Sequence, residues 1–362
     1  MHLTLIAGAR PNFMKIAPII RAIEEINISE VKLQYRLVHT GQHYDKNMSE
    51  QFFEQLGIPQ PDANLGAGGG TQAEQTAAIM VGFEKYLNEH PTDLVLVVGD
   101  VTSTLACSIV AKKMNIRVAH VEAGIRSGDL SMPEEINRIV TDSITDYFFT
   151  TSELANQHLR QSGVPDNHIF FVGNTMIDTL MANLTKLRAP AWWEAKKWQL
   201  NQYLVLTLHR PANVDNPEQL SGLLSAITAH SGGMPIIFPV HPRTQQSLQK
   251  TGIHANNLFL TEPMGYLEFI WLVKHARAVI TDSGGITEET TVLGVPCMTL
   301  RNNTERPETV SMGTNVLLGT APDAIGPALE HLFADKWKKG SVPPLWDGKA
   351  AERIVEVLLK LA

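Results

Sequence analysis

Short apolar runs, each bounded by turn residues, recur along the chain and alternate with longer segments of helical pattern. The runs are four to six residues long and mostly lack polar alternation, which is typical of strands that are buried on both faces. We therefore predict parallel strands at residues 3–7, 35–38, 94–98, 117–121, 147–150, 169–172, 203–208, 236–240, 257–260, 278–281 and 297–300.

Helical segments lie between these runs. A chain that repeats the order strand, helix, strand forms parallel sheets with helices on both faces. The predicted fold class is therefore α/β. The clearest helical patterns cover residues 14–26, 72–88, 103–114, 133–146, 220–230, 266–275 and 348–362.

The predicted strands are too many for one small doubly wound sheet, and the sequence contains a break. A helical pattern over 174–197 is interrupted at Ala189-Pro190 and followed by the Trp-rich stretch AWWEAKKWQL, after which the strand pattern starts again. We expect one domain over 1–175 and a second over 176–347. The terminal segment 348–362 is amphipathic and needs an apolar surface to cover.

Composition narrows the classes of function. The formal net charge of −7 over 362 residues argues against a nonspecific nucleic-acid binder, which needs a basic face. No apolar run approaches the ~18–20 residues that cross a bilayer, and the first residues carry no signal-peptide pattern. We expect a cytoplasmic protein with no nucleic-acid or membrane partner.

Metal-binding patterns are also missing from the sequence. Cys107 and Cys297 lie in apolar contexts far apart, without the spacing of a zinc site. His39 and His43 flank Thr-Gly-Gln, and the glycine breaks any helix that would align them as ligands. We therefore expect no metal.

Polar residues gather where the predicted strands end. In open parallel sheets, ligands bind beyond the carboxyl ends of the strands. Seven runs deliver a charged or hydrogen-bonding group there, which favours a site in the cleft between the two domains over a set of solvated loop charges. These groups are Arg10, His39, Asp100, Glu122, His209, His241 and Asp282.

Three acids are candidates for proton transfer. Asp100 and Glu122 follow adjacent predicted strands, where two carboxylates can take different pKa values and act as acid and base. Glu134 begins the PEEINR helix; the alternative is a surface ion pair with Arg138, four residues later. His209 in TLHRP is either a satisfied core histidine or a donor to a phosphate or leaving oxygen.

The segment TDSGGITEE joins a predicted strand to a helix through Gly284 and Gly285. Free backbone N–H groups and the helix dipole at such a start suit a diphosphate, and Arg306 in ERPET is a further phosphate partner. The alternative is a helix cap only, made by Ser283 or Thr287. No dinucleotide fingerprint accompanies the glycines, so we expect no nicotinamide cofactor.

Seven motifs, in order and over nearly the whole chain, resemble the non-hydrolysing UDP-N-acetylglucosamine 2-epimerases. They are GARPNFMKIAPI, HTGQHYD, VVGDVTST, HVEAGIRSGDLSMPEEINR, TLHRP, DSGGITEE and TERPE. The resemblance implies a GT-B-like arrangement of two Rossmann-like domains whose parallel sheets face an interdomain cleft. It also implies that the helix over 348–362 crosses back to the first domain, that the protein is a homodimer, and that it uses no cofactor.

The implied reaction interconverts UDP-N-acetylglucosamine and UDP-N-acetylmannosamine by anti-elimination of UDP to 2-acetamidoglucal and re-addition. Such a path needs carboxylates that move a proton and cationic groups that hold the departing diphosphate. The resemblance gives catalytic positions to Asp100, Glu122, Glu134 and His209. It gives substrate contacts to Arg10, Lys15, Arg138, Phe269, Ser283, Gly284, Gly285, Glu289 and Arg306, and a site for an activating second UDP-N-acetylglucosamine to Gln42, His43 and His241.

The chain departs from the family pattern at three named positions. Where members usually read GTRPE, this chain has Ala9 and Asn12, and Ala212 stands where HRxEN has its glutamate. These departures keep open a 2-epimerase of a modified UDP-N-acetylhexosamine. A GT-B glycosyltransferase, a catalytically silent UDP-sugar sensor and a hydrolysing epimerase also stay open as functions of this chain.

Overall fold

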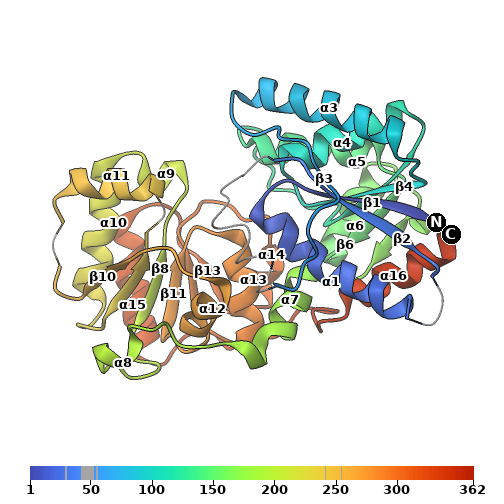
Figure 1. Cartoon of the computed structure of the whole chain (residues 1–362). Helices are drawn as coiled ribbons and strands as arrows, with labels where there is room; N and C mark the ends of the chain where they lie inside the picture. The colour runs from blue at the N-terminus through green and yellow to red at the C-terminus, as the bar shows by residue number, and fades with distance from the viewer. Residues whose placement is uncertain (29–30, 42–52, 54–55, 241, 254) are drawn as a thin grey trace. The chain divides into compact units, whose positions relative to one another are not determined.

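The computed structural model describes residues 1–28, 31–41, 53, 56–240, 242–253 and 255–362, and these form two compact units (Figure 1). Unit 1 contains Met1–Ala182 together with Pro344–Ala362, and unit 2 contains Asn183–Pro343. Among the described residues, no helix is both long and apolar enough to span a membrane.

Unit 1 is built on a parallel sheet whose strands run in the order β3-β2-β1-β4-β5-β6-β7. The central strands are continuous apolar runs, and β4 is buried along its whole length, as expected for strands covered on both faces. The strands are β1 (His2–Ala7), β2 (Gln34–His39), β3 (Ala63–Asn64), β4 (Leu94–Val98), β5 (Arg117–Val121), β6 (Tyr147–Thr150) and β7 (Ile169–Phe171).

Helices cover both faces of this sheet. Figure 1 shows α3, α4 and α5 on one side and α1 with α16 on the other, and residues of α3 and α4 share an apolar cluster with β4. The helices are α1 (Arg10–Ile26), α3 (Gln72–Glu89), α4 (Thr102–Lys113), α5 (Pro133–Ile144), α6 (Glu153–Gln161), α7 (Thr175–Asn183) and α16 (Ala350–Leu361).

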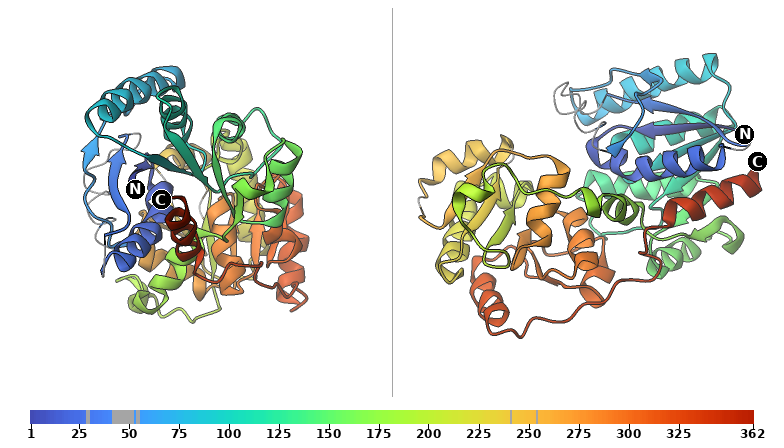
Figure 2. Two further views of the ribbon diagram at one scale, coloured as in Figure 1. Left: turned by 90° about the vertical axis from the view of Figure 1, so that its right-hand side faces the viewer. Right: turned by 60° about the horizontal axis from the view of Figure 1, so that its bottom comes forward.

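The terminal helix α16 returns to unit 1 and brings the two chain ends side by side (Figure 2). Asp178 on α7 accepts hydrogen bonds from the N–H groups of Ala350 and Ala351, at 3.1 and 2.6 Å, and so caps α16. Thr179 donates to the carbonyl oxygen of Met14 on α1 at 2.6 Å. Because α7 is tied into unit 1, the chain divides after Ala182, not after residue 175 as we expected.

Unit 2 has a second parallel sheet, in the order β10-β9-β8-β11-β12-β13. The two sheets are arranged alike around the first strand of each unit. Strands β9 and β10 lie on one side of β8, as β2 and β3 lie on one side of β1, and the later strands lie on the other side. The strands are β8 (Leu204–Thr207), β9 (Ile236–Pro239), β10 (Leu258–Thr261), β11 (Ala278–Thr281), β12 (Cys297–Thr299) and β13 (Asn315–Leu317).

Alternate side chains along β8 enter two different apolar clusters. Leu204 and Leu206 pack with α10 and α15, whereas Tyr203 and Val205 pack with α12 and Trp193. The helices of unit 2 are α8 (Trp193–Lys196), α9 (Pro211–Val214), α10 (Pro217–His230), α11 (Pro242–Thr251), α12 (Tyr266–Lys274), α13 (Gly284–Leu293), α14 (Pro307–Ser311) and α15 (Ile325–Phe333).

The α/β class is confirmed, and each predicted strand is present within one or two residues of its expected bounds. The strands β3 and β13 were not predicted because runs of two and three residues carry no readable pattern. The helical pattern over 174–197 is not one long helix, since α7 ends at Asn183 and α8 begins at Trp193.

Candidate active site

Each sheet has one point where the strand order reverses, and the candidate site residues follow the strands at these points. In unit 1 the reversal lies between β1 and β4, whose ends lead into Arg10 and Asp100. In unit 2 it lies between β8 and β11, which lead into His209 and Asp282. Ligands of open α/β sheets bind at such switch points because the loops diverge there and leave room.

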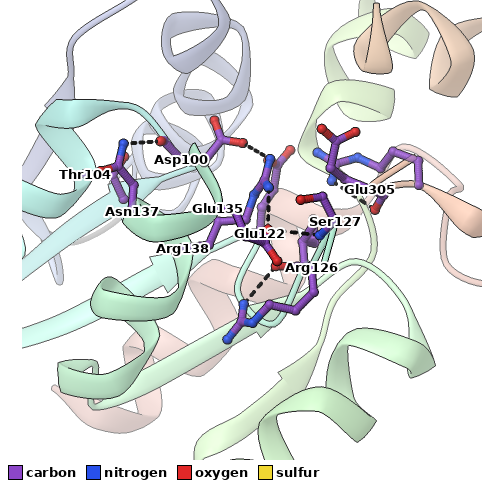
Figure 3. Close-up of polar contacts among 12 residues, drawn as sticks. Asp100, Thr104, Glu122, Arg126, Ser127, Glu135, Asn137, Arg138 and Glu305 are labelled. Carbon is purple, nitrogen blue, oxygen red and sulfur yellow. Dashed lines mark hydrogen bonds and ion pairs between the residues drawn. The ribbon is translucent and has the colours of Figure 1, made fainter. Parts of the chain in front are cut away.

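Asp100 is held from two directions by α5 (Figure 3). Its carboxylate pairs with Arg138, and its carbonyl oxygen accepts a hydrogen bond of 2.8 Å from the side-chain amide of Asn137. Arg138 also donates to Glu135 at 2.8 Å. Asp100 is therefore held at both its carboxylate and its carbonyl oxygen, and its side chain is 25% exposed.

Glu135, and not Glu134, is the partner of Arg138 within α5. Glu135 is 1% exposed and also accepts the N–H groups of Ser127 and Gly128, both at 2.9 Å. Burial alone would raise the pKa of Glu135, but these N–H groups and Arg138 lower it below its ordinary value. Glu135 therefore fixes the loop that leads into α5.

The surface ion pair considered for Glu134 and Arg138 does not form. Arg138 is 5% exposed, and its guanidinium pairs with Asp100 and Glu135. Glu134 is half-buried in the first turn of α5 and has no ion-pair partner among the described residues.

Glu122 forms a buried ion pair with Lys15 of α1, with 2.6 Å between Nζ and Oε2. Glu122 has a φ of 71°, a left-handed conformation that is strained for a residue with a side chain. Gly99 has a φ of 67°, which favours glycine, and a Cβ atom there would lie 2.9 Å from the Lys15 ammonium. The ends of α1, β4 and β5 thus converge on one charged pair.

Arg10 and Asn12 lie in the first turn of α1. Arg10 is exposed, whereas Asn12 is 2% exposed and accepts the N–H groups of Gly8 and Ala9 at 3.1 and 2.9 Å. The amide of Asn12 also donates to the carbonyl oxygen of Val98 at 2.9 Å. The polar atoms of Asn12 are thus bonded to the backbone of the β1 and β4 ends, which gives this departure from the family motif a structural role.

His209 in unit 2 forms a pair with a fully buried carboxylate. Its Nδ1 lies 2.8 Å from Asp282, which is 0% exposed. Asp282 also accepts the N–H groups of His209 and Arg210 and the side-chain amide of Asn213. Burial alone would raise the pKa of Asp282, but His209 and these donors lower it.

The pair orients the imidazole of His209. An ionised carboxylate on Nδ1 fixes the proton there and leaves Nε2 for a ligand. The side chain of His209 is 45% exposed, which excludes the alternative of a core histidine.

The amino end of α13 carries Ser283, Gly284 and Gly285, all half-buried. Ser283 makes no side-chain cap, and Thr287 donates its hydroxyl to the carbonyl oxygen of Gly284 at 2.6 Å. The alternative of a purely capped helix start is therefore wrong. A Cβ atom on Gly285 would meet nothing within 4 Å, so this helix start has room for an anion.

Buried arginines lie beside this helix start. Arg306 pairs with Glu288, and Arg301 binds Glu305 through two bonds of 2.7 and 2.8 Å. Arg210 lies 3.6 Å from the same Glu305 carboxylate. Burial alone would raise the pKa of Glu305, but the three arginines lower it to about 2. The carboxylates of Glu288 and Glu305 thus hold these guanidinium groups in place.

The remaining predicted contacts in unit 2 have defined positions. Glu289 is 3% exposed and accepts the hydroxyl of Tyr266 at 2.9 Å, and Phe269 on α12 is half-buried against the cluster around Trp193. The expected activator residues Gln42, His43 and His241 lie outside the described residues. Within the described ranges, no three His, Cys, Asp or Glu side chains cluster as metal ligands would.

Sequence reasoning missed the residues that support these groups. Glu135 and Asn137 lie in the quoted PEEINR motif, so a test for buried partners could have found them, whereas Asp282 was expected after its strand but not as the partner of His209. Arg301 and Glu305 are four residues apart around a turn, and their pairing depends on the fold of that turn.

A model of the family described as UDP-N-acetylglucosamine 2-epimerase matches residues 25–359 of the chain. The UDP-N-acetylglucosamine 2-epimerase of Methanocaldococcus jannaschii is 42% identical over 371 residues, covering 99% of each chain. The UDP-2,3-diacetamido-2,3-dideoxy-D-glucuronate 2-epimerase of Pseudomonas aeruginosa is 37% identical over 365 residues, covering 100% of each.

Solved structures agree. The M. jannaschii UDP-GlcNAc 2-epimerase in complex with UDP-GlcNAc and UDP has a TM-score of 0.90 and 42% identity, covering 99% of this chain and 100% of that one. A glycotransferase of kitacinnamycin has a TM-score of 0.59 at 10% identity, covering 99% of this chain and 98% of that one, and shows a shared fold alone. The GT-B-like fold class expected from the sequence is confirmed.

Proposed function

Because this chain belongs to the UDP-N-acetylglucosamine 2-epimerase family, a family of isomerases, we propose that it interconverts UDP-N-acetylglucosamine and UDP-N-acetylmannosamine without hydrolysis. One observation carries the proposal. In unit 1, Asp100 follows the switch-point strand β4, Glu122 follows the neighbouring strand β5 and Glu134 lies in the first turn of α5, whereas the switch point of unit 2 bears a histidine and a helix start. The first set suits proton transfer at carbon, and the second suits a departing diphosphate.

Unit 2 has the role of holding UDP. The N–H groups of Gly284 and Gly285 and the dipole of α13 bind the diphosphate, with Ser283 and Arg306 beside them. Glu289 binds the ribose, and Phe269 lies on the uracil side. His209, with its Nδ1 proton fixed by Asp282, donates through Nε2 when protonated to the phosphate oxygen that leaves C1.

Unit 1 has the role of moving the proton. A carboxylate takes the C2 proton as the C1–O bond to UDP breaks, which leaves 2-acetamidoglucal and UDP with the electron pair on the phosphate oxygen. Re-addition of UDP at C1 and return of a proton to the opposite face of C2 completes the inversion. Asp100, Glu122 and Glu134 are the groups that perform these two transfers, with Arg10, Lys15 and Arg138 as the cations around them.

A modified sugar is the second candidate substrate. The P. aeruginosa relative acts, by its name, on a 2,3-diacetamido glucuronate, and it matches the present chain over its full length. The departures at Ala9 and Ala212 remove polar groups that family motifs usually carry, which supports a difference in the sugar. The similarity to a glycotransferase, at 10% identity, adds nothing on activity.

The test is a time course with UDP-N-acetylglucosamine, followed by proton and phosphorus NMR. We expect UDP-N-acetylmannosamine to accumulate to a constant ratio with no free UDP, and a His209→Asn variant to slow this without changing the final ratio. Free N-acetylmannosamine with stoichiometric UDP would instead identify a hydrolysing epimerase. Turnover of UDP-2,3-diacetamido-2,3-dideoxyglucuronate alone would establish the modified substrate, and tight binding without any turnover would identify a sensor.

A further inference from the structure

His120 lies on β5, two residues before Glu122, and is 0% exposed. Its Nδ1 is 2.7 Å from a carboxylate oxygen of Asp142 on α5. Its Nε2 is 2.8 Å from the carbonyl oxygen of Gly99, the residue that precedes Asp100. One side chain therefore connects β5, α5 and the loop after β4.

Both ring nitrogens of His120 donate hydrogen bonds. The Gly99 carbonyl can only accept, so Nε2 carries a proton. The second oxygen of Asp142 accepts the N–H of Gly124 at 3.0 Å and the guanidinium of Arg126 at 2.6 Å, which favours an ionised Asp142 that accepts from Nδ1. Burial alone would raise the pKa of Asp142, but His120 and Arg126 lower it. Both ring nitrogens of His120 therefore face acceptors, Asp142 on one side and the Gly99 carbonyl on the other.

The loop that carries Asp100 is held at consecutive peptide groups. The N–H of Gly99 donates to Val121 at 3.0 Å, and its carbonyl oxygen accepts from His120. The next carbonyl oxygen, that of Asp100, accepts from Asn137. Gly99 itself has a φ of 67°, so these bonds fix a turn whose direction sets where the Asp100 carboxylate points.

We propose that His120, anchored by Asp142, is a positioning residue that fixes the Asp100 carboxylate relative to Glu122. The geometry favours this role over simple packing, because the ring joins the end of the Asp100 strand to the Glu122 strand. A buried ion pair is weak evidence for stability in general, whereas precise placement of reacting groups changes rates strongly. The proposal rests on the proposed function, in that Asp100 acts in proton transfer.

Two variants separate the contacts of the ring. The amide nitrogen of glutamine lies where Nε2 lies in histidine, and that of asparagine lies where Nδ1 lies. His120→Gln keeps a donor to Gly99, whereas His120→Asn keeps only a donor to Asp142. We expect His120→Asn to lower kcat about 10- to 100-fold at unchanged KM, and His120→Gln to restore most of the rate. His168→Gln is the matched control, because His168 bonds a backbone carbonyl in unit 1, that of Asp146, through Nδ1 at 2.6 Å, and glutamine loses that bond.

Two further readouts decide the matter. When Asp100→Asn is already present, adding His120→Asn should not lower kcat further. If His120→Asn lowers kcat by the same factor with and without Asp100→Asn, the proposal is overturned. Equal losses of kcat in His120→Gln and His120→Asn would also overturn it. Nitrogen-15 NMR of the resting protein should show a proton on Nε2 of His120, the nitrogen that donates to the Gly99 carbonyl, with His120→Asn assigning the signal. An Nε2 that carries no proton would contradict the positioning role even if the proposed function held. A wild-type protein that turns over neither nucleotide sugar would overturn the proposed function, and the positioning role with it, whatever the NMR shows.

Discussion

Two histidine–aspartate pairs, His120 with Asp142 and His209 with Asp282, share the contact made by Nδ1 and differ in the surroundings of Nε2. In each, Nδ1 faces a buried carboxylate, that of Asp142 for His120 and that of Asp282 for His209. The second nitrogen of His120 is bonded to a backbone carbonyl, whereas the ring of His209 is 45% exposed with Nε2 open. The surroundings of Nε2 therefore decide what each imidazole can do. Of these two histidines, His209 is the one whose Nε2 can exchange a proton with a ligand.

Replacing Asp282 should impair turnover through His209. Asp282→Asn removes the charge that fixes the Nδ1 proton, so we expect kcat to fall about 10²- to 10⁴-fold, as for loss of His209 itself in His209→Asn. The combined variant should be no slower than His209→Asn alone. The double-mutant cycle compares steady-state rates of the wild type, Asp282→Asn, His209→Asn and the combined variant. If the losses in activation free energy add up in the combined variant, Asp282 acts independently of His209.

Each of the three acids should be needed for turnover and dispensable for UDP binding. Asp100→Asn, Glu122→Gln and Glu134→Gln keep shape and remove the charge, so we expect kcat to fall about 10²- to 10⁴-fold in each. Calorimetry should give an unchanged affinity for UDP, which we assign to unit 2. Glu153→Gln, an exposed carboxylate paired with Arg160, is the control. Full activity in all three variants would refute the assignment.

The carboxylate of Glu305 should stabilise unit 2 in a pH-dependent way. Its pKa is lowered to about 2 in the fold from an ordinary value near 4.5, so the folded state favours the ionised form. The contribution is complete above pH 4.5 and is lost as pH falls through about 2. The difference of about 2.5 pKa units corresponds to about 3 kcal/mol. Urea unfolding from pH 7 to 3 should show Glu305→Gln less stable at pH 7, with a gap that narrows below pH 4.5; a constant gap would contradict the argument.

At the scale of elements, the positions of strands and of the acids that follow them were predictable. Buried parallel strands such as β4 are uninterrupted apolar runs, so the residues after them could be read directly. The partners within α5 were not predictable in the same way. Glu134 and Glu135 are adjacent in sequence, and only the rotation of the helix decides that Glu135 turns inward to Arg138.

The carboxylate of Asp178 should determine how firmly α16 is attached. It caps this helix through two N–H groups, and loss of both acceptors costs about 1–3 kcal/mol. We expect Asp178→Ala to speed amide exchange in residues 350–361 and to leave the sheet of unit 1 protected. Ser152→Ala, which uncaps α6 instead, is the matched control, because Ser152 accepts the N–H of Ala155. Unchanged exchange in α16 would show that its apolar face alone holds it.

At the scale of the whole molecule, two units with the same strand order each bring their functional loops to a switch point. The alternation of strands and helices predicted this class, but the strand order could not be read from the pattern, because order depends on which strands pair. The homodimer implied by the resemblance stays a prediction, and so does the activator site, whose residues lie outside the described ranges.

The central claim is that this chain removes and returns the C2 proton of a UDP-N-acetylhexosamine while keeping UDP. The most direct measurement is mass spectrometry, with proton NMR, of UDP-N-acetylglucosamine incubated with the protein in deuterium oxide. We predict one deuterium per molecule, located at C2, in both the recovered substrate and the UDP-N-acetylmannosamine product, with UDP still attached. Product formed with its C2 proton intact would contradict the account.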